Sequence, residues 1–211
     1  MKKRIYHKYP KEEIAALPVA AFNGRIVVII SEGETEKAVD YLLNQPILGI
    51  DTETRPTFHR GESRKVALLQ VSTLDICFLF RLNMTGMTPS IIRLLENDSI
   101  PMVGLSLHDD LHSLRQRCPF IPGWFIDLQD MVGSLGIEDR SLQKLFANLM
   151  GMKISKRQQL SNWEADVLSE KQKLYASTDA WACLILYDEI LRLQESGNFD
   201  FIEILQTSEQ P

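Results

Sequence analysis

Short apolar runs and helical patterns alternate along the first half of the chain. Residues 25–30 are rich in β-branched side chains and predict a strand. Ser31, followed three residues later by Glu34, is typical of a capping box, so we expect a helix to begin there. The residues from Thr73 to Asp75 suit a tight hairpin turn. Further short apolar runs predict strands at residues 47–52, 66–72, 76–80 and 102–107.

The second half of the chain is mainly helical in pattern. Asp139 or Ser141 is expected to cap one helix, and Ser169 is expected to open another through a capping box. Strands in a hairpin arrangement therefore come first, strand–helix alternation follows, and helices come last. This order predicts an α/β fold in which a mixed sheet is flanked by helices on both faces, with a mainly helical C-terminal half.

The composition of the 211-residue chain is that of an ordinary soluble globular protein, with 45% hydrophobic and 24% charged residues. We expect no membrane segment, because no apolar run approaches the roughly 20 residues that a spanning helix needs. The three cysteines are odd in number and widely spaced, which is typical of reduced packing residues. With no secretion signal expected near the N-terminus, these features predict a cytoplasmic protein.

The net charge of −5 argues against a broad basic face for nucleic acid. It does not exclude an enzyme whose acidic residues bind divalent metal ions, because such ions supply positive charge locally.

A first pair of acidic residues follows a buried strand. Asp51 and Glu53 are two residues apart, so the period of a strand places both side chains on one face. Two like charges at this spacing repel each other, and a divalent cation between them would relieve the repulsion. The alternative is a strand end whose carboxylates are simply solvated.

A second acidic motif lies where a predicted strand leads directly into a helix. Asp109 and Asp110 would fall in the first turn of that helix, where either could serve as an N-terminal cap. The same position also places a carboxylate at the carboxyl edge of the sheet, where open α/β folds build their sites.

A third motif contains a tyrosine and an aspartate. Tyr175 and Asp179 are four residues apart on a predicted helix, so they share a face. A structural pair of these two side chains is the alternative to a catalytic role. They are predicted to lie beside the apolar stripe of the helix, which comprises Leu174, Trp181, Leu184, Ile185 and Leu191.

In order and separation, these three motifs resemble the DEDD superfamily of 3′-5′ exonucleases, in the tyrosine subgroup that includes RNase D and Werner-type exonuclease domains. The pattern Asp51-x-Glu53 resembles the first family motif, Asp110 the second, and Tyr175-x-x-x-Asp179 the third. Alignment with the family pattern favours Asp110 over its neighbour Asp109.

The run of residues 161–163, followed by residues 168–172, is also similar to the segment that precedes the third motif in this family. The resemblance implies an exonuclease domain at residues 24–195, between an N-terminal arm at residues 1–23 and a C-terminal tail at residues 196–211.

The resemblance further implies an RNase H-like fold and hydrolysis of DNA or RNA from the 3′ end. Two Mg²⁺ or Mn²⁺ ions are implied as cofactors, and Tyr175 would orient the attacking water. The residues implied as metal ligands are Asp51, Glu53, Asp110 and Asp179. The expected partner is a nucleic acid, as a single strand or a 3′ end, and the sequence predicts no particular protein partner.

Substrate contacts are expected from two basic segments, at residues 55–65 and 153–157, and from an aromatic group that stacks on a base. Phe58 and His112 are the candidates for stacking, and each basic segment could instead be a solvated surface. The candidate contact residues are Thr52, Arg55, His59, His112, Lys156 and Arg157. Two rival functions remain: a catalytically silent nucleic-acid-binding module of the same fold, and an enzyme that acts on small phosphoesters.

Overall fold

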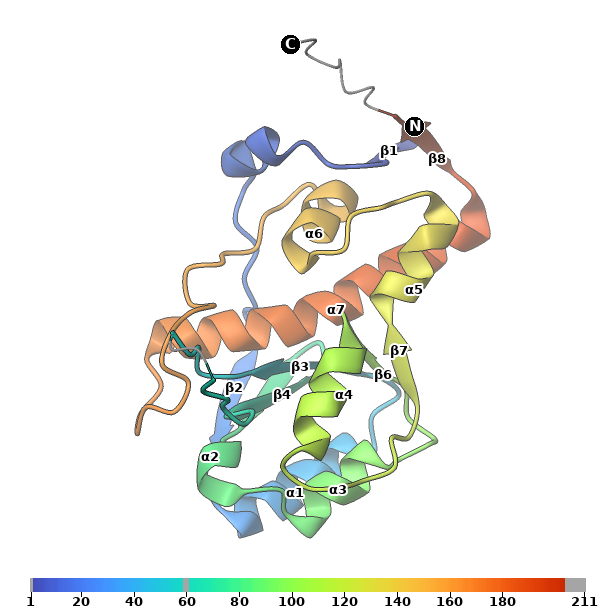
Figure 1. Cartoon of the computed structure of the whole chain (residues 1–211). Helices are drawn as coiled ribbons and strands as arrows, with labels where there is room; N and C mark the ends of the chain where they lie inside the picture. Colours follow the sequence, from blue (N-terminus) through green and yellow to red (C-terminus); the bar gives the residue numbers. More distant parts are fainter. Residues whose placement is uncertain (1, 59–60, 204–211) are drawn as a thin grey trace.

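The computed structural model describes residues 2–58 and 61–203, and within them a mixed sheet forms the centre of the molecule (Figure 1). Strand β4 is antiparallel to both of its neighbours, whereas the remaining pairs in this sheet are parallel. The strand order is β2 (Arg25–Ile29), β5 (Ile76–Phe80), β4 (Leu68–Ser72), β3 (Leu48–Glu53), β6 (Met102–Gly104) and β7 (Phe125–Asp127).

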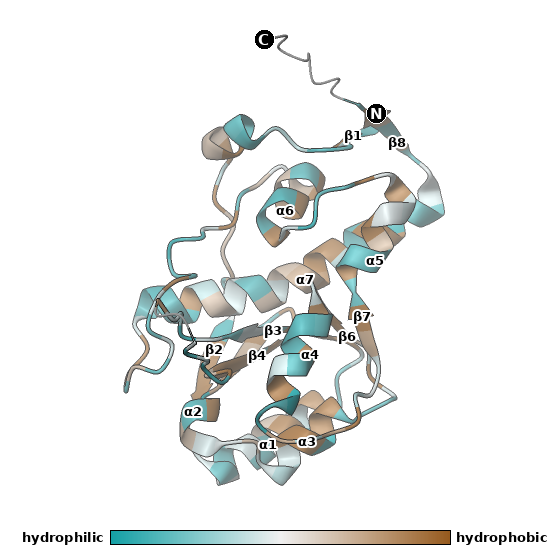
Figure 2. Cartoon of the chain, in the orientation of Figure 1, coloured by the Kyte–Doolittle hydropathy of each residue, from teal (hydrophilic) through white to brown (hydrophobic). Residues whose placement is uncertain are grey.

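Helices cover both faces of this sheet, and the core lies in two layers between them (Figure 1). On one face lie α1 (Glu32–Leu42), α3 (Pro89–Leu95) and α4 (Leu107–Arg115). On the other lies the long helix α7 (Glu170–Ser196), which is itself covered by α5 (Leu128–Val132) and α6 (Leu142–Met150). Figure 2 shows hydrophobic residues concentrated where α1 and α3 lie against the sheet. The short helix α2 (Leu82–Thr85) lies between β5 and α3 in the chain, and η2 (Gly133–Leu135) lies between α5 and α6.

The local signals in the sequence identified most of these elements. Strands β2 to β5 lie within one or two residues of their predicted positions, and β4 and β5 form the predicted hairpin. The Ser31 hydroxyl accepts a hydrogen bond from the Glu34 amide, and the Glu34 side chain completes the capping box. The Ser141 hydroxyl accepts a hydrogen bond from the Lys144 amide at the start of α6, and Ser169 and Gln172 form a second capping box at the start of α7.

The strand predicted at residues 102–107 is shorter in the structure, because β6 ends at Gly104 and α4 begins at Leu107. Between them Ser106 has a φ of 62°, in the left-handed region that costs most residues free energy. Strand β7 was not predicted, since three residues are too few to show a period of two.

The two ends of the described chain meet in a small parallel sheet (Figure 1). Strand β1 (Lys3–Tyr6) pairs with β8 (Phe199–Ile202), and the short helix η1 (Lys11–Ala16) follows β1. Ile5 is completely buried among residues of α5, α6 and α7. The predicted N-terminal arm and part of the predicted tail therefore pack on the domain rather than extending from it.

The apolar stripe predicted for α7 is wrong at its first position, because Leu174 is 40% exposed. Helix α7 is covered by the sheet on one side and by α5 and α6 on the other, so buried residues occupy much of its circumference. Small side chains such as Ala176, Ala180 and Ala182 are completely buried and allow close contact with both layers. None of the helices in the described part of the chain combines the length and apolar character needed to cross a membrane.

A glycine on β3 allows α7 to lie directly on the sheet. A Cβ atom at Gly49 would be 2.1 Å from the carbonyl oxygen of Ala180. Because side chains alternate along a strand, Gly49 shares its face with Asp51 and Glu53. The close approach at Gly49 therefore places the residue before Ala180, Asp179, beside the two acids of the strand.

We predict that Gly49→Ala lowers the free energy of unfolding by about 1–3 kcal/mol, because the added methyl group forces α7 away from β3. Gly33→Ala is the matched control: Gly33 lies in α1 with nothing within 4 Å of an added Cβ atom. This control should leave the protein as stable or slightly more stable. Urea unfolding of the two variants measures the difference, and equal stability would contradict the close contact.

Candidate functional site

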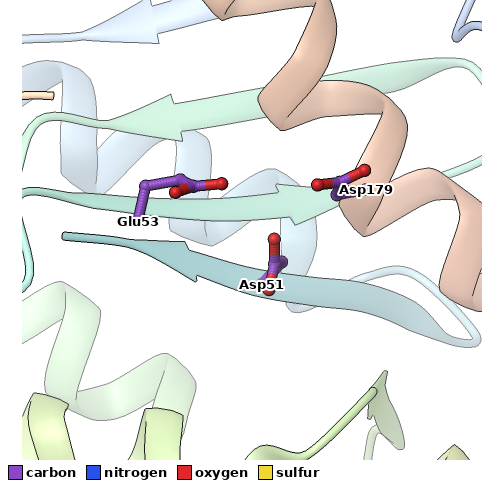
Figure 3. A group of neighbouring side chains, drawn as sticks. All are labelled: Asp51, Glu53 and Asp179. Atoms are coloured by element: carbon purple, nitrogen blue, oxygen red, sulfur yellow. The ribbon is translucent and has the colours of Figure 1, made fainter. Parts of the chain in front are cut away.

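Three carboxylates from two elements meet at the carboxyl end of β3. One oxygen each of Asp51, Glu53 and Asp179 lies within 4.8 Å of the others. Figure 3 shows the two strand residues and the helix residue directing their carboxylates toward a common space. The alternation along β3 and the close packing of α7 therefore bring together three of the four acids that the sequence analysis singled out.

Asp110 reaches the same region from α4, on the other side of the sheet. Its carboxylate accepts a hydrogen bond from the Thr52 hydroxyl, in the residue between the two acids of β3. The neighbouring Asp109 side chain is 87% exposed and contacts His108. Of the two adjacent aspartates, the structure therefore directs Asp110 toward the site and Asp109 toward solvent.

The start of α4 is capped by a residue that the sequence analysis did not identify. The Asp127 carboxylate accepts hydrogen bonds from the amides of Ser106, at 3.0 Å, and Leu107, at 2.7 Å. Asp127 belongs to β7, so this cap depends on a long-range strand pairing. Asp127 rather than Asp109 or Asp110 therefore supplies the N-terminal cap, and the Asp110 carboxylate instead accepts a hydrogen bond from Thr52. The only local signal was an aspartate directly after a short apolar run.

The pKa values of the clustered acids are raised, chiefly because burial disfavours the charged carboxylates. Burial, with the charges of Asp110, Glu53 and Asp179, raises the pKa of Asp51 well above its usual value. The pKa of Glu53 is raised to about 9 by burial and by the charges of Asp179 and Asp110.

The pKa values of the other two carboxylates, Asp179 and Asp110, are raised less. Burial raises the pKa of Asp179 to about 7, although Tyr175 and the Lys156 charge both oppose the shift. Burial also raises the pKa of Asp110 to about 6, against the effect of the Thr52 hydrogen bond. These groups cannot all be ionised at neutral pH without a nearby cation, and carboxylate oxygens are ligands that Mg²⁺ and Mn²⁺ prefer.

Tyr175 lies one helical turn before Asp179 and borders the same space. Burial and the charges of Asp179 and Glu53 raise the pKa of its phenol, so the phenol stays protonated. Its ring packs against Trp163, which is completely buried, with 5.9 Å between the ring centroids. Because Trp163, in the segment before α7, is completely buried, its contact with the Tyr175 ring restricts the position of the phenol.

Asp51, Glu53, Asp179 and Tyr175 line a cavity of about 250 Å³. Thr52 and Lys156, two of the predicted contact residues, also line this cavity. Ser155 and Gln159 line it as well, although the sequence analysis did not identify them. No pattern in the sequence marked Ser155 or Gln159, since both enter the cavity from an irregular segment.

The other predicted contact residues do not line this cavity or lie outside the described residues. Arg55 forms an ion pair with Glu164, at 3.2 Å. His112 is exposed on α4 and lies beside Gln116, and Arg157 lines a neighbouring cavity. His59 lies outside the described residues.

Comparison with known proteins identifies relatives of the whole domain. A model of the 3′-5′ exonuclease family matches residues 26–195. The bifunctional 3′-5′ exonuclease/ATP-dependent helicase WRN of Mus musculus is 30% identical over 191 residues, covering 86% of this chain and 14% of that protein. The exonuclease 3′-5′ domain-containing protein 2 of Drosophila melanogaster is 33% identical over 157 residues, covering 72% of this chain and 27% of that protein.

Solved structures show the same fold. The EXO domain of Aedes aegypti Nibbler superposes with a TM-score of 0.77 at 20% identity, covering 86% of this chain and 95% of that one. Escherichia coli RNase D gives a TM-score of 0.72 at 19% identity, covering 82% of this chain and 46% of that one. The predicted RNase H-like α/β fold is therefore confirmed. The chain spans less than a third of the two curated relatives described above.

We predict that the metal-free protein becomes less stable as pH rises from about 5 to about 9. In the folded state the pKa values of Glu53, Asp179 and Asp110 are raised to about 9, 7 and 6. Their ordinary values are about 4. The folded state therefore binds more protons than the unfolded chain in this window, and the stability linked to those protons is lost as pH rises through the raised pKa values.

Thermal unfolding in a chelator, across that pH range, measures this effect. Mn²⁺ should oppose the loss of stability at the alkaline end, because it binds the ionised carboxylates of the folded state. In the chelator, Glu53→Gln should reduce the change in melting temperature between pH 5 and pH 9. Glu195→Gln, at an exposed remote position, should leave that change as it is in the unaltered chain. A flat profile for the unaltered chain would contradict the raised pKa values.

Proposed function

The chain belongs to the 3′-5′ exonuclease family, and from this premise we propose that it hydrolyses phosphodiester bonds from the 3′ end of a DNA or RNA strand with the help of two divalent metal ions. The observation that supports this proposal most directly is the convergence of Asp51, Glu53 and Asp179 beside Tyr175. These residues come from two elements that are more than 120 positions apart in the chain, so local structure alone does not explain their meeting.

The residues present fit a pair of Mg²⁺ or Mn²⁺ ions. Asp51, Glu53 and Asp179 would hold one ion, and Asp110 with Asp51 would hold the other. The donors are carboxylate oxygens whose ionised forms are disfavoured without a cation, as their raised pKa values show. Bound ions would supply the charge that makes a water nucleophilic at neutral pH and that stabilises the departing 3′ oxygen.

Tyr175 would orient the attacking water. Burial and the charges of Asp179 and Glu53 raise the pKa of this phenol, so we assign it to positioning the water rather than to removing its proton. A neutral phenol can donate one hydrogen bond and accept another, so it can bridge the Asp179 carboxylate and a water molecule. The packing of its ring on buried Trp163 would hold this geometry without cost at the moment of reaction.

Two further side chains have proposed supporting roles. Lys156 lines the cavity and its charge already acts on Asp179, so its ammonium group could contact a phosphate that enters the site. Thr52 would act on Asp110, since its hydroxyl hydrogen-bonds that carboxylate and fixes its orientation.

A nucleic-acid strand is the substrate that the relatives favour. A solved complex of Trypanosoma brucei RNase D with RNA U12 superposes on this chain with a TM-score of 0.68, at 18% identity. A relative of another kind is DNA polymerase I of Aquifex aeolicus, which is 30% identical over 151 residues. Both DNA and RNA are therefore included in the proposal, and we further propose that the chain acts in the cytoplasm.

We predict that the chain shortens 5′-labelled strands one nucleotide at a time when Mg²⁺ or Mn²⁺ is present. Matched DNA and RNA strands, followed on sequencing gels, measure the activity and the preference between them. Asp51→Asn should abolish hydrolysis while leaving the fold intact, because it removes a metal ligand without changing the shape of the side chain. Strand binding without hydrolysis by the unaltered chain would favour a silent binding module, and preference for a mononucleotide would favour a small-phosphoester enzyme.

A second prediction concerns the phenol. Tyr175→Phe should lower kcat by about 10²-fold with little change in strand affinity, because positioning of the water is lost while contacts to the strand remain. Tyr187→Phe is the matched control, since Tyr187 lies on the same helix and lines a different cavity. An equal loss in both variants, or a loss of affinity alone, would contradict the proposed role.

A further inference from the structure

Two arginines near the catalytic cavity share a single carboxylate oxygen. Arg55 and Arg64 each donate a hydrogen bond to the Oε2 atom of Glu164, at 3.2 Å and 3.0 Å. Arg117 also lies close enough for the Glu164 charge to oppose the lowering of its pKa by burial. One carboxylate oxygen thus contacts two guanidinium groups, which is the kind of environment that also suits a phosphate.

Arg55 and Arg64 also line a second cavity. The second cavity has a volume of about 430 Å³, and Arg55, Glu62, Arg64 and Leu160 are among the residues that line it. Gln159 lines the catalytic cavity and the next residue, Leu160, lines the second. A strand that leaves the catalytic site in this direction would therefore pass directly beside the two arginines.

The distance from the catalytic acids also suits an adjacent nucleotide. Arg55 is two residues after Glu53, so their Cα atoms can be at most about 7 Å apart. Phe58, which is 81% exposed, and Leu160, which is 70% exposed, provide apolar faces at the edge of the same cavity. Bases of a single strand stack on exposed aromatic faces such as that of Phe58.

We propose that Arg55 and Arg64 form a subsite for a backbone phosphate upstream of the scissile bond, and that the Glu164 carboxylate occupies this subsite until a strand displaces it. The inference rests on the proposed exonuclease function and adds a step to substrate binding. Glu164 acts as an internal competitor for the strand, and it does not contact the reacting atoms.

Displacement of Glu164 requires only a side-chain rotation. Trp163, the preceding residue, is completely buried, and the Glu164 amide donates a hydrogen bond to the Asn162 side chain. The main chain is therefore fixed, whereas the Glu164 side chain is 24% exposed and its arginine partners are 35–40% exposed. Ion pairs at such positions are weak, so a phosphate can exchange with the carboxylate.

The test measures strand binding rather than hydrolysis. Fluorescence anisotropy would follow a 5′-labelled eight-nucleotide strand, with every variant made in the Asp51→Asn background so that the strand stays intact. Glu164→Gln should tighten binding by about threefold to tenfold, because the competing charge is removed while the side-chain shape is kept. Binding of the mononucleotide thymidine 5′-monophosphate, measured by competition, should not change, since it is too short to reach the arginines.

Glu195→Gln is the matched control. It removes the same charge from an exposed position on α7 whose Cα atom is about 24 Å from that of Asp179 along the helix. Arg64→Gln provides a second variant and should weaken binding of the eight-nucleotide strand alone. In the Arg64→Gln background, Glu164→Gln should increase the affinity for the strand by less, because Arg64 and Glu164 form an ion pair with each other.

Each alternative outcome has a distinct meaning. If Glu164→Gln weakens strand binding, or changes the affinity no more than Glu195→Gln does, Glu164 does not compete with the strand and the proposal is wrong. The proposed exonuclease function would still stand in that case. If no variant and no parent chain binds a strand, the proposed function itself fails.

Discussion

The close contact between α7 and β3 is the constraint on which the site depends. Gly49 lets the Ala180 carbonyl approach the strand, and this contact places Asp179 against Asp51 and Glu53. The three carboxylates repel one another and are costly to bury, so they do not hold the helix in place. The apolar contacts of α7 with the sheet and with α6 supply the stability that keeps them together.

The fourth acid is held from the other side of the sheet by an independent set of contacts. Asp127 caps α4 through the amides of Ser106 and Leu107, and Thr52 fixes the Asp110 carboxylate by a hydrogen bond. Strand β3 thus contributes two of the acids, and the helices α7 and α4, on opposite faces of the sheet, contribute one each. Rigid elements rather than loops position all four, which is the arrangement that a metal site with defined geometry requires.

Local features of the fold and site were predictable from the sequence, and long-range ones were not. Capping boxes at Ser31 and Ser169 and the alternation at Asp51 and Glu53 involve residues within three positions of each other, so a single segment contains the whole signal. The Asp127 cap and the Glu164 ion pairs join residues that are 20 or more positions apart. Their partners become known only when β7 joins the sheet and the segment before α7 folds beside the site. The exposure of Leu174 has the same origin, since it depends on where the neighbouring layers end.

The most direct test of this account is anomalous diffraction from crystals soaked in Mn²⁺. The account predicts a strong anomalous peak among the carboxylates of Asp51, Glu53 and Asp179, with metal–oxygen distances of about 2.0–2.3 Å, and a second peak toward Asp110 once a nucleotide is bound. Crystals in which Mn²⁺ binds elsewhere, or in which the three carboxylates remain without an ion at saturating Mn²⁺, would contradict it.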